Sequence, residues 1–410
     1  MINVLFTEAL GLLPPWLVER VAFDQSGARI DFHLGFGAAR GDCPACQATS
    51  QPIHDRLERT WRHLNFFQYQ AYLHAPVPRV ACGTCGKTSQ IAVPWADPRS
   101  GFTLLFEAWA LTLAQCMPML RVAKLLGVAD QRLWQRLGRT VLAARDRESF
   151  AAVRHVTVDE TARRRGHSYL TVVACPEEKR VLFATEGKDA MTLSDFASDL
   201  IEHGGQPAQI TGIAMDFSAA FIKGAADHLP NAEVSFDPFH LIALASTAVD
   251  EVRRSEVKTE PSLRGQRYSL LKDESHLTVK QKGFVETLRI SNLKSARAWR
   301  MKEALREIVA EKPCAQITEM KLDTLMNWLS RSRLEPMVRL GQTINRYYTG
   351  IVRAISQRRT NAYAESLNAI IQAAKTRARG FRTSENFIMM IYLIAGKLQY
   401  LPANPMKYAS

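Results

Sequence analysis

The sequence predicts a multidomain protein: an N-terminal metal-binding module, a helical domain, and an α/β domain that an all-helical insertion interrupts. Two Cys-x-x-Cys pairs occur in the first 100 residues. Short strand-like runs alternate with helical runs over residues 151–240, whereas residues 241–350 are charged, helix-prone and poor in strand signals. At 410 residues the chain is long enough for several such domains.

Basic residues outnumber acidic ones. Lys and Arg total 53 against 40 for Asp and Glu, so the formal net charge is +13. This excess favours a polyanionic partner, although a merely basic soluble protein is the alternative. We expect no signal peptide, because the mildly apolar start lacks a basic region and is broken by Pro14 and Pro15. No apolar run is long enough to span a membrane, so we expect a cytoplasmic, reducing location.

Residues 1–100 carry the cysteine pairs Cys43-Pro-Ala-Cys46 and Cys82-Gly-Thr-Cys85. Two such turns supply two thiolates each, which predicts one tetrahedral zinc site of structural type with no open position. Chance pairs or a disulfide are the alternatives. Basic and aromatic residues between the pairs suit DNA contact or a solvated face over a small core, namely Arg56, Arg59, Trp61, Arg62, His63, Phe66, Phe67 and Tyr69.

Residues 101–150 predict three helices. The apolar pattern of 102–115 stops at Pro118, a second run covers 120–126, and a third begins at Asp130 after a turn at Gly127. We expect Asp130 to be the N-cap of the third helix. A helix, a glycine turn and a helix are typical of a helix-turn-helix, with a plain helical hairpin as the alternative. In a helix-turn-helix the residues facing the major groove would be Gln131, Arg132, Gln135 and Arg136.

Residues 151–240 predict an α/β domain. The expected strands are 155–159, 169–175, 181–185, 209–216 and 233–237, and the expected helices are 193–202, 217–228 and one that opens at Pro238. Three strands followed by helix, strand, helix, strand and helix is the order of a ribonuclease-H-like fold. Ligands of such sheets gather at the carboxyl ends of strands. Asp159 and Asp216 are expected at two of those ends.

We therefore expect five segments: a zinc-ribbon-like DNA-binding module over 1–100, a helix-turn-helix domain over 101–150, the first part of a ribonuclease-H-like catalytic core over 151–240, a helical insertion domain over 241–350, and the second part of the core over 351–410. In the insertion, Trp299 and Trp328 are expected to be core anchors.

The last segment contains a predicted helix over residues 360–375 with two faces. The expected core face is Tyr363, Leu367, Ile370, Ile371 and Ala374, and the opposite polar stripe is Asn361, Glu365, Asn368 and Gln372. Glu365 is the one acid between Arg353 and Arg382, in a stretch otherwise rich in basic residues. It could be a salt-bridge acid or a metal ligand placed beside a polyanion.

Asp159, Asp216 and Glu365 together predict a site for divalent cations, magnesium or manganese. Two such ions about 3.5–4 Å apart hold the attacking and leaving oxygens of a phosphoryl transfer. Each acid alone is weak evidence, since a strand-end Asp is often a cap or turn former. Glu160, Asp195 and Asp237 are alternative acids.

Polar and basic residues near these acids complete the predicted site. We expect an orienting or DNA-positioning role for Asp237, His240, Asn361 and Asn368. We expect phosphate contacts from Arg163, Arg164, Arg165, Arg358, Arg359, Lys375, Arg377 and Arg379.

The chain resembles the DDE transposases of bacterial insertion sequences in the ISL-three group over nearly its whole length. The resemblance rests on the cysteine pairs, the helix-turn-helix, and the motifs Val158-Asp159-Glu160, Met215-Asp216, Asp237-Pro-Phe-His240 and Asn361-Ala-Tyr-Ala-Glu365-Ser-Leu-Asn368 with Arg379-Gly-Phe381. Ser366 stands where the family usually has glycine, and Gln372 where relatives are often basic.

This resemblance implies that Asp159, Asp216 and Glu365 are the catalytic triad and that the helical stretch before Glu365 is the family's insertion domain. It implies binding of double-stranded DNA at terminal inverted repeats, strand cleavage, strand transfer into target DNA, and at least a homodimer on paired ends. The expected location is the bacterial cytoplasm, associated with the nucleoid. A non-catalytic DNA-binding regulator and a structure-selective nuclease are the competing hypotheses.

Overall fold

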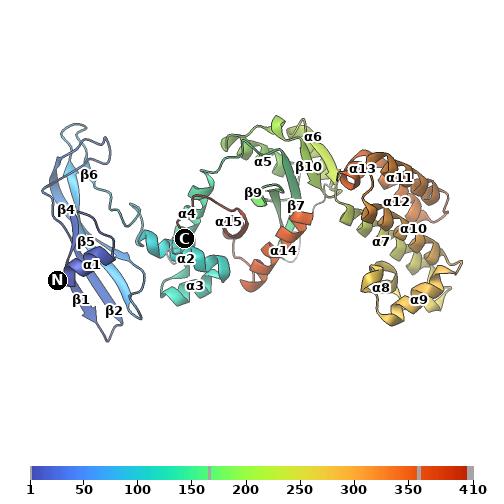
Figure 1. Cartoon of the computed structure of the whole chain (residues 1–410), viewed down its shortest axis with the longest axis horizontal. Helices are drawn as coiled ribbons and strands as arrows, with labels where there is room; N and C mark the ends of the chain where they lie inside the picture. The colour runs from blue at the N-terminus through green and yellow to red at the C-terminus, as the bar shows by residue number, and fades with distance from the viewer. Residues whose placement is uncertain (1, 165–167, 358–361, 404–410) are drawn as a thin grey trace. The chain divides into compact units, whose positions relative to one another are not determined.

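The computed structural model describes residues 2–164, 168–357 and 362–403. The chain folds into two compact units (Figure 1). The N-terminal unit holds residues 1–146 with the segment from Leu398 on, and the C-terminal unit holds residues 147–397.

The N-terminal unit begins with α1 (Ile2–Ala9) and a mixed sheet in the order β1-β2-β5-β4-β3, with β6 paired to β5. Its strands are β1 (Trp16–Asp24), β2 (Arg29–Phe36), β3 (Arg40–Gly41), β4 (Gln51–Arg62), β5 (Gln70–Ala81) and β6 (Thr88–Gln90). Alternate residues of β2 and β5 are buried, because successive strand side chains point to opposite faces. Phe32 and Leu73 thereby pack with Trp61 into one core.

Three helices follow in the same unit: α2 (Leu104–Cys116), α3 (Met119–Leu126) and α4 (Asp130–Arg145). Gly127 ends α3 at φ 67°, a left-handed conformation that glycine adopts without strain. The capping role expected for Asp130 is wrong. Ala129 is the N-cap, and Asp130 is the first helical residue, where its charge favours the positive end of the helix dipole.

The C-terminal unit is built on a sheet in the order β11-β10-β7-β8-β9. Its strands are β7 (His155–Arg164), β8 (Ser168–Cys175), β9 (Arg180–Glu186), β10 (Gly212–Met215) and β11 (Glu233–Phe236). β7, β8 and β9 are antiparallel neighbours, whereas β10 is parallel to both β7 and β11. Asp216 directly follows β10 as predicted, but Asp159 lies within β7 rather than at its end, because β7 stays paired with β8 as far as Arg164.

Helices cover both faces of this sheet (Figure 1). They are α5 (Met191–Glu202) and α6 (Ala219–His228) on one face, and α14 (Ala362–Arg377) and α15 (Ser384–Ala395) on the other. Val158 packs with Phe196 and Phe221 in the core under α5 and α6. Since neighbouring residues of a strand face opposite ways, Asp159 faces α14.

A block of helices separates β11 from α14 in the sequence: α7 (Pro238–Glu256), α8 (Arg267–Leu271), α9 (Val279–Arg289), α10 (Lys294–Glu311), α11 (Ala315–Ser330), α12 (Glu335–Arg346) and α13 (Tyr348–Ser356). Trp299 is buried in its core as predicted, but Trp328 is 41% exposed and is not a core anchor. Trp328 belongs to an outward stripe of α11 with Ile317 and Met320, spaced for one helix face. In the described part of the chain, we find no helix with the length and hydropathy of a membrane span.

The block returns to the sheet through α13. A Cβ at Gly350 would lie 2.6 Å from the Phe236 ring, so this position requires glycine for α13 to approach β11 so closely. Arg353 reinforces the contact, because its guanidinium donates to the Val234 carbonyl at 2.5 Å and pairs with Glu233 at 3.1 Å. The chain is therefore back at the sheet before α14 begins.

Candidate active site and zinc centre

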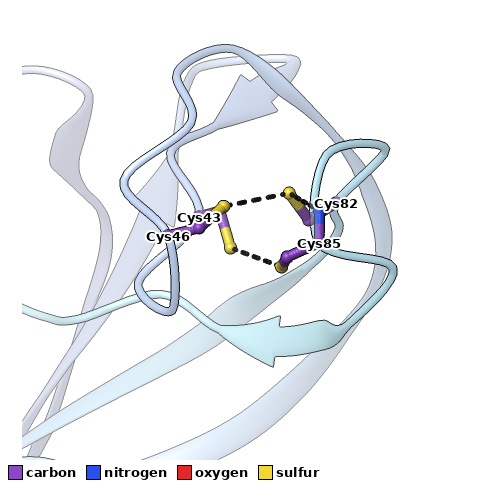
Figure 2. A group of neighbouring side chains, drawn as sticks. All are labelled: Cys43, Cys46, Cys82 and Cys85. Carbon is purple, nitrogen blue, oxygen red and sulfur yellow. Dashed lines mark hydrogen bonds between the residues drawn. The ribbon is translucent and has the colours of Figure 1, made fainter.

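The four cysteines meet between the β3–β4 and β5–β6 connections (Figure 2). Their sulfurs all lie within 4.8 Å of one another, with Cys43 Sγ 3.8 Å from Cys85 Sγ and Cys46 Sγ 3.5 Å from Cys82 Sγ. All four are free thiols, so the disulfide alternative is wrong. Sulfurs about 2.3 Å from a tetrahedral zinc ion lie just under 4 Å apart, so this set fits zinc.

The two cysteine turns have the same backbone design. Gln47 N–H donates to the Cys43 carbonyl and Gly86 N–H to the Cys82 carbonyl, both at 2.9 Å. Gln47 and Gly86 have φ of 60° and 68°, so Gln47 takes the left-handed conformation that glycine takes in the second turn. The backbone therefore presents both thiol pairs to one point, and Cys85 N–H also donates to Cys82 Sγ at 3.5 Å.

The predicted acids occupy the edge of the second sheet where β10 and β11 end. Asp159 projects from β7, Asp216 follows β10, Asp237 follows β11, and Glu365 lies in the first turn of α14. In residues 2–164, 168–357 and 362–403, only the four cysteines bring three or more ligand atoms within 4.8 Å of one another. The carboxylates of Asp159, Asp216 and Glu365 are therefore spaced more widely than the thiols.

Electrostatics show that these acids share one environment. Burial raises the pKa of Asp159, and Asp216 raises it further, whereas the Glu160 N–H and His240 oppose the rise. Burial also raises the pKa of Glu365, with added repulsion from Asp237 and Asp159. Crowded, partly buried carboxylates resist carrying full negative charge, which is the setting that a bound cation relieves.

Asp237 and His240 form a pair at the start of α7. Asp237 is buried, caps the helix by accepting from Phe239 N–H at 3.2 Å, and bonds His240 Nδ1 at 2.8 Å. This hydrogen bond raises the pKa of His240, and Asp216 and Asp159 raise it further against the effect of burial. The protonated form of His240 is thus favoured beside Asp237, and the orienting or DNA-positioning role of the pair stays a prediction.

A ladder of hydrogen bonds joins the polar side chains of α14 to β7. Asn368 Nδ2 donates to Asp159 Oδ2 at 3.3 Å and its amide oxygen accepts from the Thr161 hydroxyl at 2.7 Å. Gln372 Nε2 donates to the same hydroxyl at 2.5 Å. The expected two faces of this helix are therefore wrong in part: Asn368 and Gln372 face the sheet, whereas Ile370 is 51% exposed.

Several of the basic residues that are expected to contact DNA also form hydrogen bonds within the protein. The Lys375 ammonium donates to the Ala162 carbonyl at 2.5 Å, and burial lowers its pKa. Arg163 donates to the Ser384 hydroxyl at 2.7 Å, and Arg164 to the Arg382 carbonyl at 2.6 Å. These bonds hold both cations against the fold, and the phosphate contacts expected of Lys375 and Arg163 stay predictions.

The remaining predicted residues of this region differ in position. Arg164, Arg377 and Arg379 are exposed. Arg165, Arg358, Arg359 and Asn361 lie outside the described residues.

The helix α4 exposes most of the predicted groove-facing side chains. Gln131, Arg132 and Gln135 are exposed, but Arg136 pairs with Glu107 at 2.6 Å and with Asp97, and its side chain is only 13% exposed. The DNA contact predicted for Arg136 is thus a misassignment. Arg139, which the sequence interpretation missed, is exposed on the stripe of Gln131 and Gln135, at the four-residue spacing that marks one helix face.

Some of the basic and aromatic residues between the cysteine pairs also belong to the fold. Arg62 and Trp61 are 3% and 1% exposed, whereas Phe67 is 79% exposed. Arg62 bonds the Ala71 carbonyl at 3.2 Å, so it is a structural cation.

Three family models match the chain. A model described as a transposase matches residues 156–391, a helix-turn-helix domain of transposase family ISL3 matches 91–141, and a zinc-finger of transposases IS204, IS1001, IS1096 and IS1165 matches 39–85. The first alone covers more than half of the chain, and the resemblance inferred from the motifs is confirmed.

Whole-length relatives agree with these models. The transposase for insertion sequence element IS1557 of Mycobacterium tuberculosis is 30% identical over 439 residues, covering 97% of each chain. The transposase for IS1001 of Bordetella parapertussis is 24% identical over 404 residues, covering 95% of this chain and 98% of the relative. The chain therefore belongs to the ISL3 family of insertion-sequence transposases, enzymes of the DDE class that catalyse DNA transposition.

Proposed function

We propose that this transposase binds the terminal inverted repeats of its element and cuts and joins DNA strands at Asp159, Asp216 and Glu365, on a ribonuclease-H-like core that the helices of 241–350 interrupt. The observation that carries the proposal is the gathering of these acids at one sheet edge from elements far apart in sequence. Burial raises the pKa of Asp159 and of Glu365, and repulsion between neighbouring carboxylates adds to both shifts. The sheet order and the mix of parallel and antiparallel pairs support the proposed core.

The three carboxylates fit hard divalent cations, magnesium or manganese, which lower the pKa of an attacking water or hydroxyl and stabilise the leaving oxygen. Asn368 holds Asp159 toward α14, and the Glu160 N–H fixes the other carboxylate oxygen at 2.8 Å. Asp237 fixes the ring of His240. These bonds keep the oxygens in place before DNA arrives, which favours in-line transfer.

We propose that the N-terminal unit recognises the DNA. We expect the exposed residues of α4, above all Arg132 and Gln135, to enter a major groove. The zinc module belongs to the same unit. Paired element ends require two catalytic centres, so we propose a homodimer or larger assembly on DNA, in a nucleoid-associated protein of the bacterial cytoplasm.

A plasmid that carries both element ends around a marker tests this function. With purified full-length protein and magnesium, we expect cleavage at the ends and joining into a target plasmid. Asp159→Asn, Asp216→Asn and Glu365→Gln should abolish both steps without loss of DNA binding. Asp195→Asn, at an exposed acid of α5, is the matched control and should act like the parent.

The same assay separates the competing functions. Cleavage by Asp159→Asn at the parental rate would disprove the catalytic assignment. Cleavage by the parent without joining would indicate a nuclease, and binding without either step would indicate a regulator.

A further inference from the structure

Lys188 lies at the same sheet edge as the acids. β9 is antiparallel to β8, and β8 is antiparallel to β7, so β9 runs in the direction of β7, β10 and β11. The segment that leaves β9 therefore emerges where Asp216 follows β10 and Asp237 follows β11. This is the edge at which ligands of such sheets bind.

The backbone before Lys188 is fixed. Gly187 has φ of +102°, a conformation that favours glycine. Its N–H donates to the Tyr169 carbonyl at 3.1 Å, and its carbonyl accepts from the Thr171 hydroxyl at 2.9 Å. The start of the Lys188 side chain is therefore held against β8.

The charged end of Lys188 is oriented as well. Its ammonium lies 4.5 Å from the centroid of the Tyr169 ring and 3.9 Å from Glu160 Oε2, yet the side chain is 51% exposed. An exposed pair at this distance adds little to stability. The contacts hold a cation with an open side beside Glu160, at the sheet edge where Asp216 and Asp237 follow their strands.

A phosphate fits this position. Glu160 lies in the negative field of Asp216 and Asp159, and Lys188 offsets that field. A DNA strand brought to the acids needs a cation on its phosphates, and a lysine ammonium on a held stem supplies a point charge for one. If the acid cluster cuts DNA as proposed above, we propose that Lys188 binds a phosphate of the strand at that cluster, with Glu160 and Tyr169 holding its ammonium in position beforehand.

Methylphosphonate substrates test the contact. The probes are duplexes that carry one element end and its host flank, with a single uncharged linkage placed in turn at each position near the cleavage site. Single-turnover cleavage with magnesium is compared for the parent, Lys188→Gln, Lys188→Arg and the control Lys179→Gln, which lies in the turn before β9 at the far end of that strand.

We expect Lys188→Gln to cleave about tenfold more slowly and Lys188→Arg to recover most of the rate. At one linkage the uncharged probe should slow the parent but not Lys188→Gln, a result that a structural role of Lys188 would not produce. Equal sensitivity of parent and Lys188→Gln at every linkage would overturn the proposal. Asp159→Asn, measured alongside, reports separately on the catalytic assignment.

Discussion

The side-chain amide of Asn368 donates a hydrogen bond to Asp159, 3.3 Å from Nδ2 to Oδ2, across 209 positions of the sequence. The bond ties the strand that carries one acid to the helix that carries Glu365. Because Thr161 and Gln372 extend the same ladder, the relative position of Asp159 and Glu365 depends on polar side chains outside the acid set.

Asn368→Ala should lower the cleavage rate by about ten- to a hundredfold, the usual cost of removing the partner of a metal ligand. Gln372→Ala should have a smaller effect, because it acts through Thr161. Magnesium titration is the decisive measurement: the rate of Asn368→Ala should recover in part at high magnesium, while DNA affinity stays parental. Asn327→Ala, at an exposed site of α11, is the control, and an equal loss there would reject the positioning role.

Cys43→Ser should release the metal of the N-terminal unit and lower its unfolding free energy by several kcal/mol, because zinc binding is coupled to folding. Metal analysis should find one zinc per parental chain and none in the variant. Cys314→Ser, outside the cluster, should keep both zinc and stability. A zinc-free parent of normal stability would disprove the zinc centre.

Arg136→Ala should destabilise the protein by about 3 kcal/mol, since it leaves the Glu107 carboxylate, 1% exposed, without its ion-pair partner. Arg139→Ala, the same change three residues on at an exposed site, should alter stability by less than about 0.5 kcal/mol. Arg139→Ala should also weaken DNA binding and lower by about one the slope of log affinity against log salt concentration. Denaturant unfolding and binding at several salt concentrations measure both effects, and a stability loss in Arg139→Ala alone would contradict the assignment.

His63 should make stability depend on pH. Burial lowers its pKa from 6.5 to about 4, with help from Arg62, so the unfolded chain takes up the proton more readily. The stabilising contribution is therefore complete above pH 6.5 and is lost as the pH falls toward 4, by up to about 3 kcal/mol. Unfolding free energies of the parent and His63→Gln at several pH values should show a shallower slope in the variant, which rules out cysteine protonation as the cause.

Local sequence patterns predicted much of the fold because they reflect local physics. Val158 and Val173 lie in apolar runs that predict buried strands, and both are buried. Gly127 predicts a turn because glycine readily takes a positive φ, and its φ is 67°. The motifs also placed Asp216 at a strand end, where the structure has it.

Errors arose where a polar side chain finds its partner far away in sequence. Arg136 looks like a groove-facing residue until Glu107, 29 positions earlier, is folded against it. Lys375 meets the Ala162 carbonyl across 213 positions, so its helix pattern indicates an exposed cation where the fold has a bound one. No sequence motif pointed to Lys188, because only the directions of the strands bring it to the sheet edge where Asp216 and Asp237 lie.

Because Glu365 follows the helical block in the sequence, a chain whose synthesis stops early lacks this acid. A ribosome completes the cysteine turns and α4 long before it reaches α14, and N-terminal domains fold first. A product cut short by a frameshift or a stop codon within the block keeps the cysteine turns and α2 to α4, but it lacks the third acid and the segment from Leu398 on that belongs to the same unit. If these N-terminal residues bind the element ends as proposed, such a fragment should occupy the ends without cutting them, and premature termination should then yield a competitor of the full-length enzyme.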